Sequence, residues 1–563
     1  MHRKEAFAVV LVSAVLAIGL TWPIAARMNR GGRVDSGDGR YSVWNVAWVA
    51  HALTTNPWHL YDANIFDPHP NALAFSEANL VAGVMAVPAW LATKNPYTAT
   101  NSVILMSFML SAICTYVLVR RLTGSAVGAA FSAIAFAYCP FVYAHIPHMQ
   151  LLMTFGLPLV LLRLHVFVDA PSVKHAVRLG ASMALAGLAC GYYGVFAGLM
   201  AGLGALWFGI TRKLYRDPYY WIYGAGAAVV ALVIIAPFYA PYLEIQRSGF
   251  GRSLDDASGY AVGWRAYLAS PILLHRWMLP LIGTWRDVLF PGFLSIGFAI
   301  VYMLQRSTRQ PPLHVLAPGV LGFYLLLGGL AMWASFGPAG GLYTVLHETM
   351  PFFSMLRAPA RFGLLVTLAL AIIAGAGFSN FGAFFADRRR GWVAAGIVMA
   401  TMARSTAGPL KVVDAPPLPV AHQRLAGLPR GPVAEFPYFA IAPDRHRHTE
   451  YMLFSTFHWK PLINGYSDHI PGEAFAEMAP LSSFPSIEAW EVLHAHRARY
   501  IVLHWNRFTP EEHERITAAM PRLRRLMRAI VEQPDASLFE VVRWPRRATL
   551  PDGGDPFEPL FGG

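Results

Sequence analysis

Acidic and aromatic side chains gather in residues 27–76, a polar stretch that directly follows the first apolar segment. Asp35, Asp38 and Tyr41 stand close together there, in DSGDGRY. A carboxylate beside low-dielectric protein can act as a general base toward a hydroxyl or amine, or can ligate a hard cation. The glycines on both sides of Asp38 favour a turn that presents its carboxylate. The structural alternative is an aspartate that caps a helix over 41–53 or lies in a solvated turn.

Arg357 and Arg361 form a second candidate group, in RAPARF, where an apolar segment begins at Phe362. Guanidinium groups grip phosphate oxygens in pairs, and a helix start adds backbone N–H donors without partners. The two arginines therefore predict a phosphate site. The alternative is that they anchor the chain to lipid head groups.

His145 and His148 lie in HIPHMQLL, at a turn between two apolar segments. A three-residue step can place two histidines on one side of a helix, but a proline separates them and no third ligand is near. Zinc is therefore not expected, which leaves packing or hydrogen bonding to a substrate. Arg252, close to Asp255 and Asp256, is a further candidate in a long polar segment.

The C-terminal part carries polar and aromatic motifs of its own. They are DRHRH at 444–448, His458, and NGYS at 464–467. Such residues can contact a sugar, although a loop rich in His and Arg is also typical of a solvated surface. The Asn-Gly pair is first of all a turn signal.

The composition is typical of a membrane protein. Hydrophobic residues make up 55% of the 563 residues and charged residues 14%, against roughly 25% charged in soluble chains. The net charge is +13, but Lys and Arg mostly flank apolar segments and form no basic run interleaved with aromatics. The charge therefore indicates topology rather than nucleic-acid binding. The three cysteines lie inside apolar segments, so neither a disulfide framework nor a zinc site is expected.

The positive-inside rule sets the expected topology. Arg3 and Lys4 precede an apolar segment over 6–26 that is about 20 residues long, enough to cross the membrane, and that lacks a clear cleavage site. The apolar run 78–92 is too short to span and is predicted to lie along the outer interface. We expect eleven spans in the cell inner (plasma) membrane, with a cytoplasmic N-terminus and an extracytoplasmic C-terminus.

The chain changes character after residue 409, where prolines and mixed polar sequence replace the apolar segments. The pattern predicts strands at 433–436, 500–504 and 537–542 and helices at 487–496 and 510–527. We therefore expect an all-α polytopic membrane bundle over residues 1–410 and a soluble extracytoplasmic α/β domain over residues 411–563.

Several of these motifs resemble one superfamily. A first helix, an outer loop with GDGRY, the short apolar run ANLVAGVMAVPAWL and a helix ending in RRLTG are similar to the GT-C membrane glycosyltransferases. FDPHP, HIPHMQLL, LFPG, RAPARF and NGYS look like a bacterial branch with a C-terminal extracytoplasmic domain. The resemblance covers most of the chain in architecture, through motifs that are short.

The resemblance implies an inverting hexosyl- or pentosyltransferase of the cell envelope. It would move a sugar from a polyprenyl-phosphate donor to a glycan, lipid or protein acceptor on the outer face. Asp38 would be the base, with Asp35 as the alternative, and Arg357 and Arg361 would hold the lipid phosphate. Further substrate-binding candidates are His145, His148, Tyr41 and Arg252.

Some members of the superfamily carry two adjacent carboxylates, whereas Asp35 and Asp38 are three apart, so we expect no cofactor and no metal ligand, with a divalent cation as the alternative. The rival function is a non-catalytic protein that binds, flips or transports lipid-linked sugars on the same scaffold. A transporter is expected to carry charges at mid-membrane, but here most charges lie at the ends of spans, with Arg163 and Arg404 as exceptions.

Overall fold

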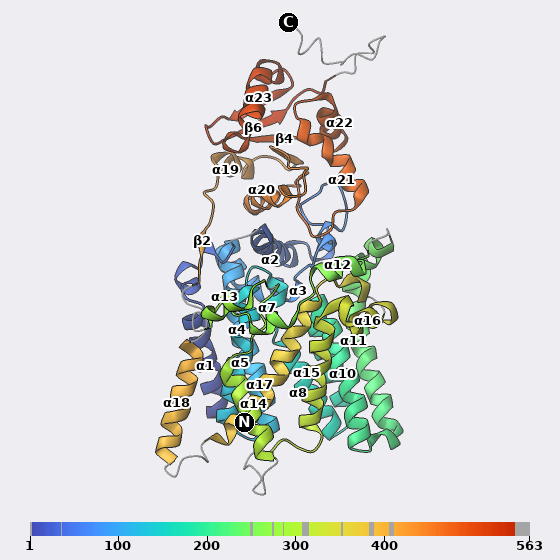
Figure 1. Ribbon diagram of the computed structural model, residues 1–563. Coiled ribbons are helices and arrows are strands. Elements are labelled where there is room, and N and C mark those ends of the chain that lie inside the picture. The colour runs from blue at the N-terminus through green and yellow to red at the C-terminus, as the bar shows by residue number, and fades with distance from the viewer. Residues whose placement is uncertain are drawn as a thin grey trace. The chain divides into compact units, whose positions relative to one another are not determined.

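A computed structural model shows a chain rich in helices (Figure 1). The described residues are 3–34, 37–247, 251–272, 275–284, 286–306, 315–350, 353–381, 388–404 and 410–545. They form two compact units. We call residues 1–28, 79–82 and 101–412 the helical unit, and residues 29–78, 83–100 and 413–563 the sheet unit. Residues 29–78 thus group with residues 413–563, although the predicted boundary at residue 410 separates them in sequence.

The helical unit is built mainly from a set of helices, most of them apolar. They are α1 (Arg3–Leu20), most of α4 (Pro96–Thr123), α5 (Ala126–Ala137), α8 (Gly156–Asp169), α9 (Val173–Ala189), α10 (Gly191–Thr211), α11 (Pro218–Arg247), α14 (Phe293–Arg306), α15 (Val320–Ser335), α17 (Gly363–Ser379) and α18 (Arg388–Arg404). Among the described residues, five helical stretches have the length and apolarity of a membrane span: Pro96–Thr123, Ala126–Ala144, Gly191–Thr211, Pro218–Arg247 and Pro359–Ser379. The chain has the helices of a membrane protein, and the count of eleven spans stays a prediction.

Small residues let the central helices of this unit approach closely. α17 packs against α5, α14 and α15, and α9 packs against α8, α10 and α11. A Cβ built on Gly375 of α17 would lie 1.9 Å from Ser132 Oγ of α5, so only glycine fits there. Ser132 Oγ also donates to the carbonyl of Ala371 at 2.8 Å. Small residues with a hydroxyl between them are a common way to join helices in membranes.

Several helix boundaries differ from the sequence-based expectation. α11 continues through Pro237 and Pro241 to Arg247, although prolines usually end or bend a helix. The run predicted at 78–92 forms α3 (Leu80–Thr93), which is 14 residues long and contains Pro88. α2 (Gly37–Thr55) begins four residues earlier than the predicted helix and includes Asp38. Asp38 is therefore part of a helix and not of a preceding turn.

The sheet unit contains a four-stranded sheet in the order β3-β4-β6-β5, of which β4 and β6 are labelled in Figure 1. The strands are β3 (Val433–Phe436), β4 (Tyr500–His504), β5 (Met527–Val531) and β6 (Ala536–Val541). β3 runs parallel to β4, and the other neighbours are antiparallel. The sequence patterns at 433–436 and 500–504 correctly predict β3 and β4. The helix predicted at 510–527 is wrong at its end, because α23 (Pro510–Leu523) stops before β5.

The early polar stretch is joined to this unit by backbone pairing. Phe66 N donates to Asn464 O at 3.2 Å, and Asp67 N donates to Leu462 O at 3.1 Å. A short antiparallel pair, β1 (Gly31–Gly32) with β2 (Val413–Asp414), adds a second link. α2 packs against α20 (His448–Ser455). Residues 29–78 are therefore held within the sheet unit by backbone pairing and by the packing of α2.

Candidate functional site

The carboxylate of Asp38 lies in the first turn of α2, where the helix dipole favours negative charge. Tyr466 Oη donates a hydrogen bond to Asp38 Oδ1 at 2.9 Å. Asp38 is partly exposed. A carboxylate in this position has one oxygen oriented by a phenol and can accept a proton from a hydroxyl group. Asp35, the predicted alternative, lies outside the described residues.

The loop that carries Tyr466 is fixed by Asn464. The side-chain oxygen of Asn464 accepts from Glu435 N at 2.7 Å, and its amide nitrogen donates to Glu435 O at 2.8 Å. Asn464 thus pairs with the backbone of β3 as a neighbouring strand would. A Cβ on Gly465 would lie 2.6 Å from the ring of Phe66, so glycine permits this close approach. The NGYS motif is a scaffold that presents its tyrosine to α2.

Tyr41 is buried one helical turn beyond Asp38. Its ring meets that of Tyr466 edge to face, with centroids 6.1 Å apart. Burial raises the pKa of Tyr41 to about 12, opposed by hydrogen bonds with Asn45, Ser76 and Ser467. Tyr41 therefore supports Tyr466 as a neutral phenol. Its role in substrate binding stays a prediction.

The DRHRH motif packs against the start of α2. A Cβ on Gly37 would lie 2.5 Å from Cβ of His446, so glycine lets the two segments touch. Farther along, Glu450 binds Arg507 and lies 3.8 Å from Arg40 of α2. The motif thus contributes to the surroundings of Asp38, which distinguishes it from a freely solvated surface.

Arg357 and Arg361 lie together in the helical unit, before and within η9 (Pro359–Phe362), which leads into α17. Tyr192 of α10 contacts the backbone at Arg357 and the side chain of Arg361. Its hydroxyl accepts from the backbone N of Arg357 at 2.7 Å and of Ala358 at 2.9 Å. Its ring lies 4.0 Å from the guanidinium carbon of Arg361, and Tyr260 lies 5.0 Å from that of Arg357. Cation–π contacts hold the two positive charges in defined orientations.

Arg252 lies in the same region of the helical unit as Arg357. Its backbone N donates to Ser354 O at 2.9 Å, and its carbonyl oxygen lies 3.1 Å from His347 Nε2. Arg252 is therefore tied to the segment that precedes Arg357. The sequence does not predict a role for Tyr192 or Tyr260, although Tyr192 stands in the GYYG motif at 191–194.

His145 and His148 lie next to each other, with ring centroids 5.8 Å apart. His145 Nδ1 donates to Phe141 O at 2.8 Å, so the neutral ring keeps Nε2 as an acceptor. Burial lowers the pKa of His145; Asp287 opposes this shift, whereas His148 and Arg361 add to it. His145 and Arg361 are thus close enough to interact electrostatically, and a neutral imidazole accompanies the arginines.

Comparison with solved structures identifies the fold. The arabinofuranosyltransferase AftD from Mycobacteria matches 96% of this chain with a TM-score of 0.52 and 14% identity. This chain covers 40% of AftD, so it spans less than half the length of that protein. The oligosaccharyltransferase of Archaeoglobus fulgidus matches 89% of this chain and 69% of its own, with 11% identity and a TM-score of 0.45.

ArnT from Cupriavidus metallidurans, solved with undecaprenyl phosphate, matches 96% of this chain and 98% of its own, with 15% identity and a TM-score of 0.42. No family model and no curated protein matches the sequence. The structural neighbours are GT-C glycosyltransferases. This chain therefore has the fold of a GT-C membrane glycosyltransferase, as the motif resemblance predicted.

Proposed function

We propose that this protein transfers a sugar from a polyprenyl-phosphate donor to a glycan, lipid or protein acceptor on the extracytoplasmic face of the membrane. The observation that carries the proposal is the Asp38 carboxylate at the start of α2, oriented by Tyr466. AftD, which shares the fold, is an arabinofuranosyltransferase, and ArnT was solved with a polyprenyl phosphate.

In this proposal Asp38 is the general base. The acceptor hydroxyl loses its proton to Asp38 as its oxygen attacks the anomeric carbon. The bond from that carbon to the phosphate oxygen breaks, and the electron pair leaves with the polyprenyl phosphate. Attack opposite to the leaving group inverts the anomeric centre. Tyr466 is a positioning residue, because it contacts Asp38 and restricts the orientation of the carboxylate.

Arg357 and Arg361 are assigned to the donor phosphate. Two guanidinium groups can bind phosphate oxygens in pairs, and their attraction strengthens as charge develops on the leaving group. Tyr192 and Tyr260 restrict both side chains before the donor binds, which lowers the entropic cost of binding. His145, with Nε2 as an acceptor, is assigned to a sugar hydroxyl. His148 and Arg252 are assigned to the outer part of this donor site.

The orientation of the chain in the membrane is part of the proposal. We infer a cytoplasmic N-terminus and an extracytoplasmic sheet unit, because Lys and Arg flank alternate apolar segments in the order that the positive-inside rule requires. Nucleotide sugars are not supplied on the outer face, so a lipid-carried donor fits this orientation.

The experiment uses purified full-length protein in liposomes that contain polyprenyl-phosphate sugars labelled in the sugar. Transfer predicts that label leaves the lipid, appears on an added envelope-glycan acceptor, and is accompanied by free polyprenyl phosphate. If labelled lipid instead crosses the bilayer with its sugar bond intact, the protein is a flippase. If the lipid is bound and neither event occurs, the non-catalytic alternative holds.

A further inference from the structure

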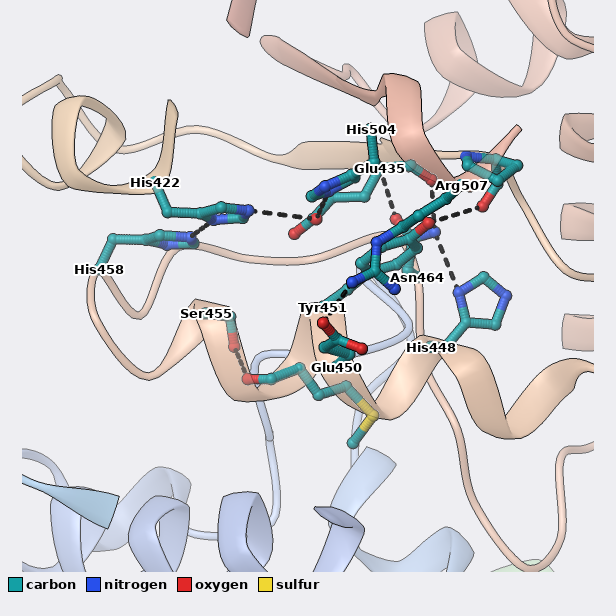
Figure 2. Close-up of polar contacts among 12 residues, drawn as sticks. His422, Glu435, His448, Glu450, Tyr451, Ser455, His458, Asn464, His504 and Arg507 are labelled. Carbon is teal, nitrogen blue, oxygen red and sulfur yellow. Dashed lines mark hydrogen bonds and ion pairs between the residues drawn. The ribbon is translucent and has the colours of Figure 1, made fainter. Parts of the chain in front are cut away.

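Three buried side chains converge in the sheet unit. His422 lies on α19 (Val420–Ala426), Glu435 on β3, and His504 at the end of β4 (Figure 2). Val502 is the partner of Glu435 in the parallel ladder, so His504, two residues further, projects from the same face. The side chains of His422 and Glu435 are 0% exposed and that of His504 is 2% exposed.

The donor atoms of this cluster are close enough to share one ion. His504 Nε2 lies 2.6 Å from Glu435 Oε2, and His422 Nε2 lies 3.4 Å from the same oxygen. All three donor atoms lie within 4.8 Å of one another. Among the described residues, neither His422 Nε2 nor Glu435 Oε1 has a hydrogen-bond partner. A fully buried carboxylate with an unpartnered oxygen is costly unless a positive charge compensates it.

A metal-free hydrogen-bond chain explains the cluster less well. Lys460 N donates to His458 Nδ1 at 3.0 Å, so the proton of the neutral His458 ring is on Nε2. That nitrogen lies 3.5 Å from His422 Nδ1, and His422 would then donate to Glu435 across 3.4 Å. Both links are longer than the usual separation of about 2.9–3.0 Å. The donors in this hydrogen-bond chain would also be neutral, so the charge of Glu435 would be compensated, within the described ranges, only through its electrostatic interaction with Arg507.

We propose that His422 Nε2, His504 Nε2 and the Glu435 carboxylate bind a divalent transition-metal ion of the zinc class. Two imidazoles and one carboxylate are a known donor set for zinc, with ligand bonds of about 2.0–2.2 Å. Tetrahedral ligands at that distance are about 3.3 Å apart, close to the 3.4 Å between His422 and Glu435. Within the part of the chain that the structure describes, Glu435 Oε1 has no hydrogen-bond partner, so the carboxylate can turn both oxygens to the ion.

The burial of all three ligands indicates a structural ion rather than a catalytic one. It would join α19, β3 and β4 around one point of the sheet unit. The backbone of Glu435 is paired with Asn464, in the loop that holds Tyr466. The ion would therefore stabilise the loop that carries Tyr466, the hydrogen-bond partner of Asp38, without contacting a substrate.

The ion also requires a change at His422. Binding through Nε2 moves the ring proton to Nδ1, which faces the protonated Nε2 of His458. We therefore expect the contact between His422 and His458 to be lost when the ion binds. His458 is not a ligand in this proposal, which makes it the matched control.

The first test measures zinc and other metals by mass spectrometry in full-length protein purified without chelators. Wild type and His458→Asn should carry near-stoichiometric metal, whereas Glu435→Gln and His422→Ala should carry little. Equal loss of metal from His458→Asn would replace the proposed ligand set with one that contains His458.

A second measurement does not depend on whether the variants fold. Wild-type protein is stripped with a chelator and then titrated with Co²⁺, whose visible absorption reports tetrahedral nitrogen and oxygen ligands. Growth of these bands to one equivalent and a raised unfolding temperature support the site. The proposal is overturned if wild-type protein is purified without metal and if Co²⁺ produces neither absorption bands nor a change in unfolding temperature. The metal-free hydrogen-bond chain would then explain the cluster. Neither result bears on whether the protein transfers sugar.

Discussion

Tyr466 Oη donates to Asp38 Oδ1 at 2.9 Å across 428 residues of sequence. Both residues lie in the sheet unit, so the bond joins the early polar stretch to the loop between α20 and α21 (Gly472–Met478). The C-terminal part of the chain thus supplies a side chain that orients the proposed base.

Removal of the Tyr466 hydroxyl should slow turnover more than it weakens donor binding. Tyr466→Phe keeps the ring against Tyr41 and loses one hydrogen bond to a charged group, worth about 1.5–3 kcal/mol. We expect kcat to fall about tenfold or more, with KM for the donor nearly unchanged. Tyr500→Phe is the control, because it loses a bond to Pro429 O elsewhere in the unit. Equal kcat values for wild type and Tyr466→Phe would exclude the positioning role.

Substitution of Arg361 should weaken donor binding. Arg361→Ala removes charge-assisted bonds to the phosphate, and we expect donor affinity to fall about 10- to 100-fold. Arg361→Lys should recover only part of this loss, because lysine lacks the planar fork that stacks on Tyr192. Lipid-phosphate binding to protein in nanodiscs measures the effect, with Arg265→Ala as the control. Unchanged affinity in Arg361→Ala would remove this residue from the donor site.

The buried amide of Asn64 should matter for stability. It accepts from Trp44 Nε1 at 3.2 Å and donates to Ser455 Oγ at 3.0 Å and Lys460 O at 3.2 Å. Asn64→Ala leaves these groups without that partner, at about 1–3 kcal/mol for each orphaned group. Thermal unfolding followed by tryptophan fluorescence should show a lowered midpoint. The control, Thr54→Ala on the exposed side of α2, should change little, and an equal midpoint for both variants would contradict this network.

Glu540 should give stability that depends on pH. Arg528 and Arg499 hold the pKa of Glu540 below its ordinary value of 4.5. A carboxyl group with a lowered folded-state pKa stabilises the fold above its unfolded-state pKa, and this contribution is lost as pH falls. The midpoint difference between wild type and Glu540→Gln should therefore be largest near pH 7 and shrink below about pH 4.5. Glu532→Gln, in an exposed pair with Arg524, is the control and should show little difference at either pH. A midpoint difference that does not change with pH would contradict the ion pairs of Glu540 with Arg499 and Arg528.

The sequence predicts the local elements better than the contacts between them. β3 and β4 follow from short β-rich patterns between turn signals, and the membrane helices follow from apolar length. The sequence does not predict the start of α2, because Gly37 and Gly39 are typical of turns, whereas in the structure Gly37 begins the helix and lies against His446.

Contacts between distant segments account for most of what the sequence did not predict at the sites. Phe66 and Asp67 pair with residues near 464 through backbone bonds that no local pattern encodes. The contacts of Tyr192 with Arg357 and Arg361 depend on the packing of α10 beside the segment that carries the two arginines. His422, Glu435 and His504 come from three elements and show no short ligand spacing. By contrast, Asp38, the two arginines and NGYS stood out because of residue type alone.

Transfer by Asp38→Asn protein tests the central proposal most directly. The measurement is the release of polyprenyl phosphate and the appearance of labelled acceptor in liposomes, with Asp62→Asn as the control. Asp62 accepts from Asn71 N at 3.0 Å in the same polar stretch, outside the proposed site. We predict that Asp62→Asn retains transfer, whereas Asp38→Asn loses at least about 100-fold while binding the donor normally. Transfer by Asp38→Asn at the wild-type rate would contradict the account.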